Sequence, residues 1–262
     1  MFRALYTAAA GMNAQELNLQ NIANNLSNAN TIGFRSRSVQ FEDLMYQDVQ
    51  APGGAMTQQT TIPTGLQLGV GARPSSTSVN KQQGELENTG NQLDVAVQGN
   101  GYFQVLTPTG TLAYTRDGSF QLNQERQIVT ADGNPLQPAI TIPANATSIT
   151  IGTDGTVSVS EPGQTQAAQV GTIQLALFPN DSGLQAIGGN LSVPTTASGD
   201  PVVGAPGSSE GMGSLQQGML EQSNVDVVQQ FVNMVLAQRS YEANSRVLQA
   251  GSQMLQDLNN IT

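Results

Sequence analysis

Four aspartates in the central part of the chain have the residue type needed for acid–base or metal chemistry: Asp94, Asp117, Asp132 and Asp154. Paired carboxylates can hydrolyse glycosides, and alternating oxygen ligands in one loop can hold calcium. The last three each precede a glycine, and Asp-Gly is the dipeptide typical of hairpin turns. None of them lies in an alternating-ligand loop, and no spacing in the sequence brings two of them together. We therefore predict turns here, and assign no catalytic residue, no metal ligand and no cofactor.

The composition excludes further classes of function. The 262 residues include no cysteine and no histidine, which removes disulfides, thiolate and imidazole metal sites, and Cys-His or Ser-His-Asp catalysis. Nine basic residues against 19 acidic ones leave a net charge of −10, which argues against nucleic acid or anionic lipid as a partner. Only 11% of residues are charged, and such a surface suits packing against copies of itself. No apolar run is long enough for membrane insertion.

A heptad pattern near the N-terminus predicts one helix over about residues 3–30. Leu5, Met12, Leu19 and Leu26 recur every seven residues, and Ala8, Ile22 and Ala29 fill the intermediate spacing. Gly33 follows, where a left-handed cap is expected. The pattern runs on past the apolar N-terminal stretch, which we interpret as a retained helix and not as a cleaved signal peptide.

The C-terminal part carries a second heptad pattern from Leu220 onward, with an apolar residue at every seventh position: Leu220, Val227, Met234, Tyr241, Leu248 and Leu255. Its companion column, four residues further on, is mostly polar: Asn224, Phe231, Gln238, Ser245 and Ser252. Ser223 or Asn224 could cap this helix, and Asp226 favours the positive end of its dipole. Two narrow seams suggest that the terminal helices pair with each other and with neighbours; an ordinary helical hairpin packed on a domain core is the alternative.

Between the helices the pattern changes twice. Glycine and proline are closely spaced from 46 to 80, which predicts an extended arm. From about 85 to 203, short alternating runs separated by turn signals predict an all-β domain. The predicted fold is α+β: long N- and C-terminal helices paired as a coiled-coil-like layer, with an extended arm and a central all-β domain. The boundaries we expect are 1–45, 46–80, 81–205 and 206–262.

The two ends of the chain together resemble the flagellar rod and hook family of axial proteins. NIANNLSNANTIGFR, from Asn21 to Arg35, is similar to the N-terminal signature of that family, and SNVDVVQQFVNMVLAQRSYEANSRVLQAGSQML to its C-terminal one. The segments GNGYFQV, YTRDGSFQLN and VTADG follow in the family's order, although Arg126 stands where a turn glycine is usual. Within the family, total length and the arm most resemble the distal rod subunits.

The resemblance implies a structural subunit and not an enzyme. It implies a helical polymer forming a hollow drive shaft that passes torque from motor to hook, with the helices as inner tube and the β domain outside. The implied partners are other copies, the proximal rod proteins, the hook protein and the surrounding peptidoglycan-level and outer-membrane ring proteins. The implied location is the basal body, reached by export without a cleaved signal peptide. A proximal rod or hook subunit is the alternative within the family, and a secreted carbohydrate-binding or hydrolytic β domain the alternative outside it.

Asparagine-rich helices with a narrow apolar seam are marginal alone, so we expect the termini to order on assembly. The expected assembly seam comprises Leu5, Met12, Leu19, Ile22, Leu26, Leu220, Val227, Met234, Tyr241, Leu248 and Leu255. The polar contacts expected between subunits are Asn21, Asn24, Asn25, Asn28, Arg239 and Asn244.

Overall fold

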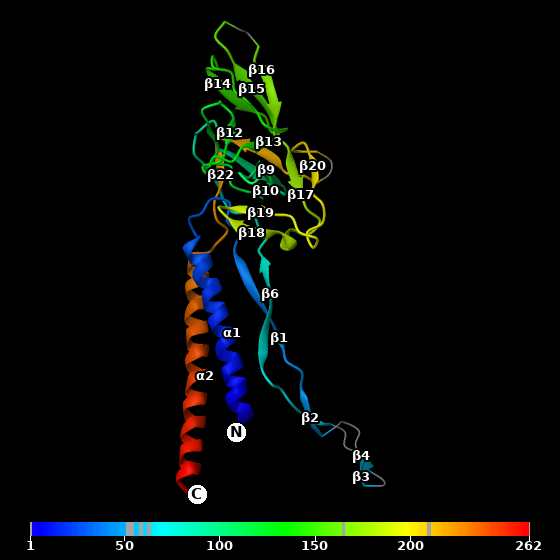
Figure 1. Cartoon of the computed structure of the whole chain (residues 1–262), viewed down its shortest axis with the longest axis vertical. Coiled ribbons are helices and arrows are strands. Elements are labelled where there is room, and N and C mark those ends of the chain that lie inside the picture. The colour runs from blue at the N-terminus through cyan, green and yellow to red at the C-terminus, as the bar shows by residue number, and fades with distance from the viewer. Residues whose placement is uncertain are drawn as a thin grey trace. The chain divides into compact units, whose positions relative to one another are not determined.

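The computed structural model describes residues 2–50, 55–57, 60–61, 64–163, 166–208 and 211–261 (Figure 1). The fold is α+β, and the chain separates into two compact units. Unit 1 comprises Met1–Ser27, Arg37–Ser78 and Asp226–Thr262; unit 2 comprises Asn28–Ser36 and Val79–Val225. The chain therefore passes from one unit to the other four times, after Ser27, Ser36, Ser78 and Val225.

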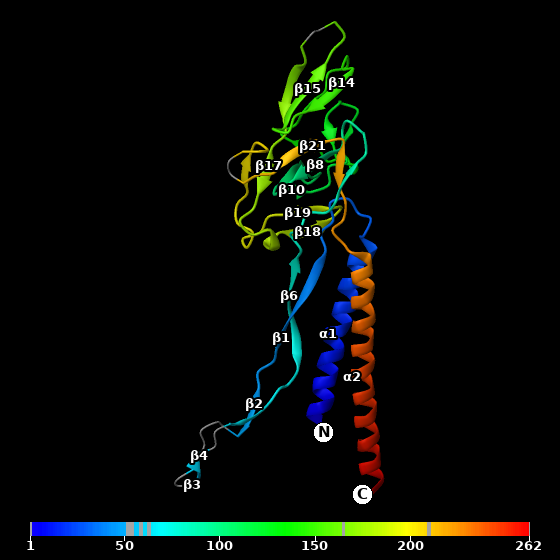
Figure 2. The same ribbon diagram turned by 180° about the vertical axis from the view of Figure 1, so that it is seen from behind.

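Unit 1 contains the two long helices, α1 (Phe2–Ser27) and α2 (Val227–Ile261), which lie side by side in both ribbon views (Figures 1 and 2). The N-terminal helix is confirmed, and Gly33 beyond it has the predicted left-handed backbone, with φ +68°. The C-terminal helix is also present and begins at Val227, just after the predicted cap region, whereas Leu220, the first member of the heptad pattern, lies in a strand. Asp226 caps α2 by accepting the Gln229 N–H at 3.1 Å.

The predicted arm forms a two-stranded ribbon with paired strands, where the sequence indicated an extended segment with no sheet. The ribbon pairs β1 (Arg37–Asp43) with β6 (Ala72–Val79), β2 (Gln47–Gln50) with β5 (Leu66–Leu68), and β3 (Ala55–Thr57) with β4 (Thr60–Thr61). Residues 51–54, 58–59 and 62–63 of the predicted arm lie outside the described residues. The sequence of these strands shows no alternation of apolar and polar residues, because β2 and β5 are exposed on both faces and so need no apolar side.

Unit 2 is built on a seven-stranded sheet in the order β18-β19-β10-β9-β17-β20, with β13 also paired to β9. These strands are β9 (Tyr102–Leu106), β10 (Leu112–Thr115), β13 (Leu136–Gln137), β17 (Leu175–Leu177), β18 (Gln185–Gly188), β19 (Leu191–Val193) and β20 (Val202–Gly204). A short 3-10 helix, Asp181–Gly183, follows β17.

The remaining strands form small sheets against this one: β11 (Gln121–Leu122) with β12 (Ile128–Val129), the trio β14 (Ser148–Ile151), β15 (Thr156–Ser160) and β16 (Ala168–Thr172), β8 (Val95–Gln98) with β21 (Ser214–Gln217), and β7 (Leu86–Asn88) with β22 (Met219–Glu221). The β structure thus extends past the predicted boundary at residue 205, because β21 and β22 pair with the two strands that open the unit. The core includes Phe103, Phe120, Ile173 and Leu175, all at most 2% exposed.

The predicted turns are partly confirmed. Gly133 and Gly155 have positive φ, and Asp154 stands in the tight hairpin between β14 and β15. The hairpin predicted at Asp117 is wrong, since the strands on either side, β10 and β11, do not pair with each other. Arg126 adopts a left-handed backbone (φ 59°), a conformation that glycine reaches more easily than a residue with a side chain.

Candidate assembly surfaces

Small residues line the contact between α1 and α2. Ala8 and Ala237 are buried at 5% and 3% exposure. A Cβ on Gly251 would lie 2.4 Å from Leu5 Cδ2, which shows how closely that leucine approaches the other helix. Gly11 likewise leaves room for the Asn244 amide, whose Nδ2 would lie 2.8 Å from a Cβ there. The two helices therefore approach each other closely at Gly11 and Gly251.

The structure brings most of the predicted seam residues together but separates one of them. Ile22 is 4% exposed, and the half-buried members are Leu5, Met12, Leu19, Leu26, Met234, Leu248 and Leu255. Val227 and Tyr241 are more open, each 39% exposed. Leu220 is buried in unit 2, where β22 pairs with β7, and so is not part of the helix seam.

The companion column of α2 lies three residues after the apolar column and not four. It comprises Gln230, Ala237, Asn244 and Gly251, all buried or half-buried. Phe231, in the column predicted from the sequence, is 51% exposed. Ala237 and Gly251, three residues after Met234 and Leu248, could have indicated this column, because closely packed helices favour small side chains at their contact.

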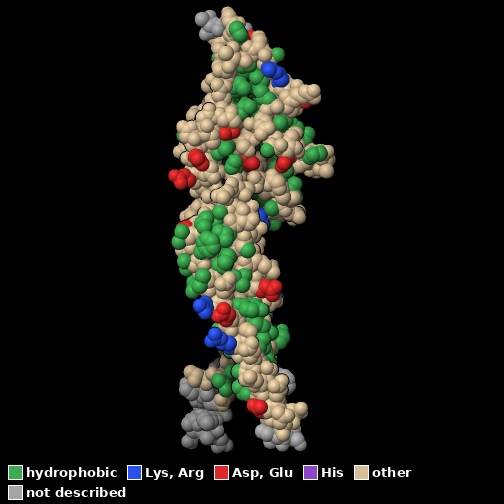
Figure 3. Space-filling model, turned by 90° about the vertical axis from the view of Figure 1, so that its left-hand side faces the viewer, with side chains coloured by type: hydrophobic (Ala, Val, Ile, Leu, Met, Phe, Trp, Pro, Cys, Tyr) green, Lys and Arg blue, Asp and Glu red, His purple; other side chains and the backbone are tan. Residues whose placement is uncertain are grey.

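An exposed apolar stripe covers the first turns of α2. Its members, 49% to 73% exposed, are Val228, Phe231, Val232, Val235 and Leu236. Figure 3 shows hydrophobic side chains gathered on this part of the helix. Contiguous exposed apolar surface of this kind marks an interaction site in a soluble protein.

Asn25 is used within the chain, which corrects its prediction as a contact between subunits. Its side chain is buried, Nδ2 donates to the Arg37 carbonyl at 2.7 Å, and Oδ1 accepts the Arg37 N–H at 2.9 Å. The carboxamide thus binds both backbone groups of one residue of β1, as a neighbouring strand would. Nδ2 also lies 3.4 Å from Asn21 Oδ1.

The other predicted polar residues are distributed over both units. Asn28 Oδ1 accepts the Thr31 hydroxyl in unit 2 at 3.2 Å. Arg239 forms an exposed ion pair with Glu242 at 3.3 Å, one turn along α2. Asn24 is exposed on α1, and Asn244 lies in the seam opposite Gly11.

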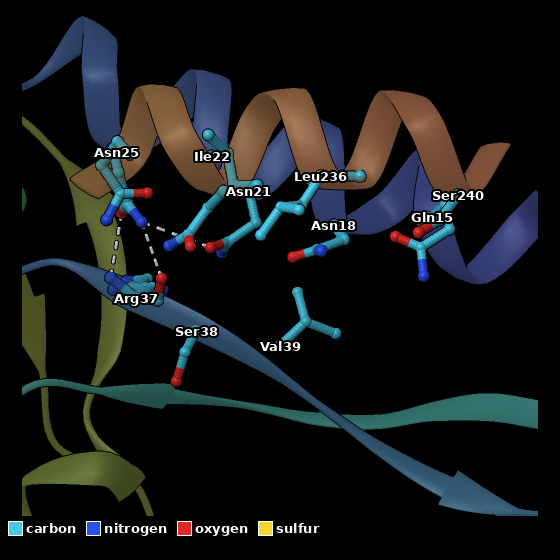
Figure 4. A pocket seen from close by; sticks show the side chains of 13 residues that line it. Gln15, Asn18, Asn21, Ile22, Asn25, Arg37, Ser38, Val39, Leu236 and Ser240 are labelled. Atoms are coloured by element: carbon cyan, nitrogen blue, oxygen red, sulfur yellow. Dashed lines mark hydrogen bonds between the residues drawn. The ribbon is translucent and has the colours of Figure 1, made fainter. Parts of the chain in front are cut away.

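A polar groove of about 310 Å³ lies between α1, β1 and α2, all within unit 1 (Figure 4). The side of α1 contributes the carboxamides of Gln15, Asn18, Asn21 and Asn25; β1 contributes Arg37, Ser38 and Val39; α2 contributes Gln230, Asn233, Leu236 and Ser240 among others. Such a lining offers both hydrogen-bond donors and acceptors, with no ionised carboxylate.

Unit 2 holds a buried ion cluster where the chain leaves α1 and where it approaches α2. Glu221, 2% exposed, lies 3.7 Å from Arg35 and 3.7 Å from Arg116. Both guanidinium groups stack on the Tyr102 ring, at 5.9 and 5.4 Å from its centroid. Burial lowers the pKa of Arg116 to about 10, with Glu221 acting in the opposite direction.

The same region joins the connecting segments by hydrogen bonds. Asn224 Oδ1 accepts the Ser36 N–H at 2.7 Å, and Nδ2 donates to the Asn80 and Gln82 carbonyls at 3.2 and 2.8 Å. The segment after α1, the segment after β6 and the segment before α2 are thereby fastened to one another. This use of Asn224, and not helix capping, is what the sequence did not reveal.

The central aspartates accept hydrogen bonds within turns. Asp94 accepts from Thr89, and Asp117 accepts from Ser119 two residues on. Hydrogen bonds from Thr156 lower the pKa of Asp154. Among the described residues, no three Asp, Glu, His or Cys side chains are grouped to hold a metal ion. Across that same part of the chain, neither helix combines the length and hydropathy needed to cross a membrane.

Family models match three parts of the chain: the flagella basal body rod protein model at residues 5–35, the flagellar hook protein FlgE/F/G D1 domain at 96–159, and the flagellar basal body rod FlgEFG protein C-terminal model at 216–261. The chain is 48% identical to the flagellar basal-body rod protein FlgG of Caulobacter vibrioides over 97% of each chain. It is 48% identical to FlgG of Buchnera aphidicola subsp. Baizongia pistaciae, over 98% of this chain and 99% of the relative. It is 36% identical to FlgG of Bacillus subtilis, over 100% and 99%.

Proposed function

Because the chain belongs to the flagellar basal-body rod family, as a structural subunit of the distal rod, we propose that its copies assemble into a helical tube through their terminal helices. In this proposal α1 and α2 pair as a coiled-coil-like layer, and the layer forms the inner wall of a hollow shaft that carries torque to the hook. The observation that carries the proposal is the exposed apolar stripe on α2.

The fold of a single chain leaves this apolar stripe exposed. Its five side chains are 49% to 73% exposed, so burying them between copies contributes on the order of 1 kcal/mol each. The α1–α2 seam, built on Ala8, Gly11, Ala237 and Gly251, offers no equivalent surface for a symmetric pairing with itself. A stripe that meets a different surface on the next copy makes a heterologous contact, and repeated heterologous contacts generate helical filaments.

The remaining expectations belong to the same proposal. Polar contacts between copies are proposed for Asn21, Asn24, Asn28 and Arg239, and the seam residues on both helices are proposed to pack in the tube. The proposed neighbours are proximal rod proteins below, the hook protein above, and the ring proteins that surround the rod. Export without a cleaved signal peptide is proposed because helices that are marginal alone pass a narrow channel unfolded more readily.

The test replaces two stripe residues and, as a control, two exposed residues outside the stripe. Cells lacking the gene receive either the Phe231→Asp, Val235→Asp double variant or the Gln238→Asp, Gln253→Asp control, which places the same two charges on exposed positions of the same helix. We expect the double variant to be exported but absent from isolated rods, and the control to build normal rods. Normal rods from the double variant would show that the stripe is not an assembly surface.

A further inference from the structure

The ribbon contacts α1 of its own chain at two places, one on each side of the polar groove. Near the end of α1, the Asn25 carboxamide binds the N–H and the carbonyl of Arg37, at 2.9 and 2.7 Å. Near the start of α1, the Thr7 hydroxyl donates to the Val70 carbonyl, which precedes β6, at 3.4 Å. The residues of α1 that line the groove follow Thr7 and run up to Asn25. The ribbon is therefore attached to α1 at both ends of the groove and separated from it in the middle.

The register of the ribbon determines which edge of β1 faces the groove. The Ser36 carbonyl accepts the Asn80 N–H at 2.8 Å, so the peptide groups of Ser36 face β6. Two residues further along each strand, the hydroxyls of Ser38 and Ser78 lie 2.9 Å apart, which shows that the same register continues. Since the peptide groups of successive residues alternate between the two edges of a strand, those of Val39 point away from β6.

Val39 and Asn18 face each other across the groove with unused hydrogen-bonding groups. Arg37, two residues before Val39, has both of its peptide groups bound by α1, and Val39 presents its N–H and carbonyl to the same side. Within the described residues, these two groups of Val39 and the carboxamide of Asn18 have no hydrogen-bond partner. Figure 4 shows the Asn18 carboxamide opposite the Val39 side chain. Asn21, between Asn18 and Asn25, is held only by Asn25 Nδ2 at 3.4 Å.

The spacing of the carboxamides along α1 suits the spacing of the peptide groups along β1. One turn of a helix advances by about 5.4 Å, and two residues of a strand advance by about 6.6 Å. Asn21 and Asn18 lie one and two turns before Asn25, and Val39 lies two residues beyond Arg37 on a strand that runs back along the helix. Each carboxamide carries a donor and an acceptor, which are the partners that a peptide carbonyl and N–H need.

We propose that the middle of β1 closes onto α1 of the same chain when the protein assembles, so that the Asn18 carboxamide, with Asn21 beside it, binds the peptide groups of Val39 as Asn25 binds those of Arg37. The closure itself needs one chain, and its use in assembly rests on the proposed function. The movement is local, because the ribbon already contacts α1 at both ends of the groove. Once closed, the ribbon and α1 move as one body.

Access of water decides between the open and the closed state. In a single chain, water enters the groove and hydrogen-bonds to the Val39 peptide groups and the Asn18 amide, so that the open state costs little. Copies packed around the chain exclude that water, and buried polar groups without a partner are costly. Closure pairs the same groups with each other. Assembly therefore favours the closed state, in which the ribbon is fixed to α1 along the whole groove.

Cysteine cross-linking tests the closure directly, because the natural chain contains no cysteine. Rods built from the Asn18→Cys, Val39→Cys double variant are isolated, oxidised and dissolved without reductant. A disulfide needs Cβ atoms about 3.5–4.5 Å apart, a separation that closure of the groove provides. We expect a link within one chain, at a yield at least tenfold above that of the Asn13→Cys, Val39→Cys control, because Asn13 is on an exposed part of α1.

A positive control shows that oxidation works beside Val39. The hydroxyls of Ser38 and Ser78 are 2.9 Å apart, so the Ser38→Cys, Ser78→Cys variant should link within the ribbon. If that pair links while the Asn18 and Val39 variant stays unlinked, or if its link joins two chains, the proposed closure is wrong. A natural chain that never entered rods would instead overturn the proposed function.

Hydrogen exchange of the Val39 amide tests the closure without a cross-link. In rods of the natural chain we expect this amide to be protected, and Asn18→Ala should make it exchange at least tenfold faster. Alanine forms helices better than asparagine, so a weaker helix would not explain that result. Asn13→Ala, the matched change on the exposed side of α1, should leave the exchange unchanged. Equal protection of Val39 in rods of the natural chain and of the Asn18→Ala variant would overturn the closure while leaving the rod assignment standing.

Discussion

Glu221 offers a quantitative test of how the buried ion cluster joins two segments of unit 2, the one that follows α1 and the one that precedes α2. Glu221→Gln keeps the shape of the side chain but removes the anion that lies 3.7 Å from both Arg35 and Arg116. Burial lowers the pKa of Arg116 to about 10 even though Glu221 acts in the opposite direction, so removing the Glu221 anion leaves a desolvated guanidinium group without its compensating charge. Removing one partner of a buried ion pair typically costs about 3–5 kcal/mol. We expect a loss of that size in the free energy of unfolding of unit 2.

The assay is urea denaturation of the full chain, followed by near-ultraviolet circular dichroism. This signal reports unit 2, because Tyr114 packs edge-on against Phe178 at 4.8 Å in its core. Glu42→Gln is the matched control, since Glu42 pairs with Arg73 on the exposed ribbon and its loss should change stability little.

A triple variant separates charge from packing. Replacing Arg35→Met and Arg116→Met together with Glu221→Leu removes all three charges, and should recover most of the lost stability because apolar residues often replace buried ion clusters without cost. A Glu221→Gln variant as stable as the natural chain would refute the reasoning that this cluster holds the connecting segments.

Three further predictions concern the helices and the tyrosines. The Leu26→Asp, Leu248→Asp double variant should block assembly while unit 2 keeps its circular dichroism; normal rods would contradict the proposed seam. Gly251→Val should weaken helix pairing by about 1–3 kcal/mol through overpacking, measured as a higher critical concentration for assembly, and an unchanged value would count against it. Burial raises the pKa of Tyr102 and Tyr114, so raising the pH through 10 deprotonates the unfolded chain first and lowers stability. The Tyr102→Phe, Tyr114→Phe double variant should lose less stability over that pH range, and an equal loss would contradict the assignment.

The sequence predicted the features that depend on local pattern. The heptads located α1 and most of α2, and Asp154 identified a turn. Gly33 has the predicted left-handed backbone, but it does not cap α1, because that helix already ends at Ser27. Arg126 also lies in a turn, and the turn imposes on it a left-handed backbone that is strained for a residue with a side chain.

Features that depend on contacts distant in sequence were not predictable. Leu220 fits the helical period, but its pairing with Glu87 in β7 is made by a strand 133 residues away and overrides that period. The sequence assigned Asn25 to contacts between subunits and Asn224 to a possible helix cap, because their actual partners at Arg37, Ser36 and Asn80 are set by tertiary structure. The paired strands of the ribbon could not be predicted for a different reason: strands that are exposed on both faces show no alternation of apolar and polar residues.

Electron microscopy of basal bodies isolated from cells that lack this gene tests the central claim most directly. The account predicts a truncated rod with no hook attached, because the distal segment of the shaft is missing and the hook has nothing to extend from. A complete rod lacking only its hook, or an intact flagellum, would contradict the assignment of this chain as a distal rod subunit.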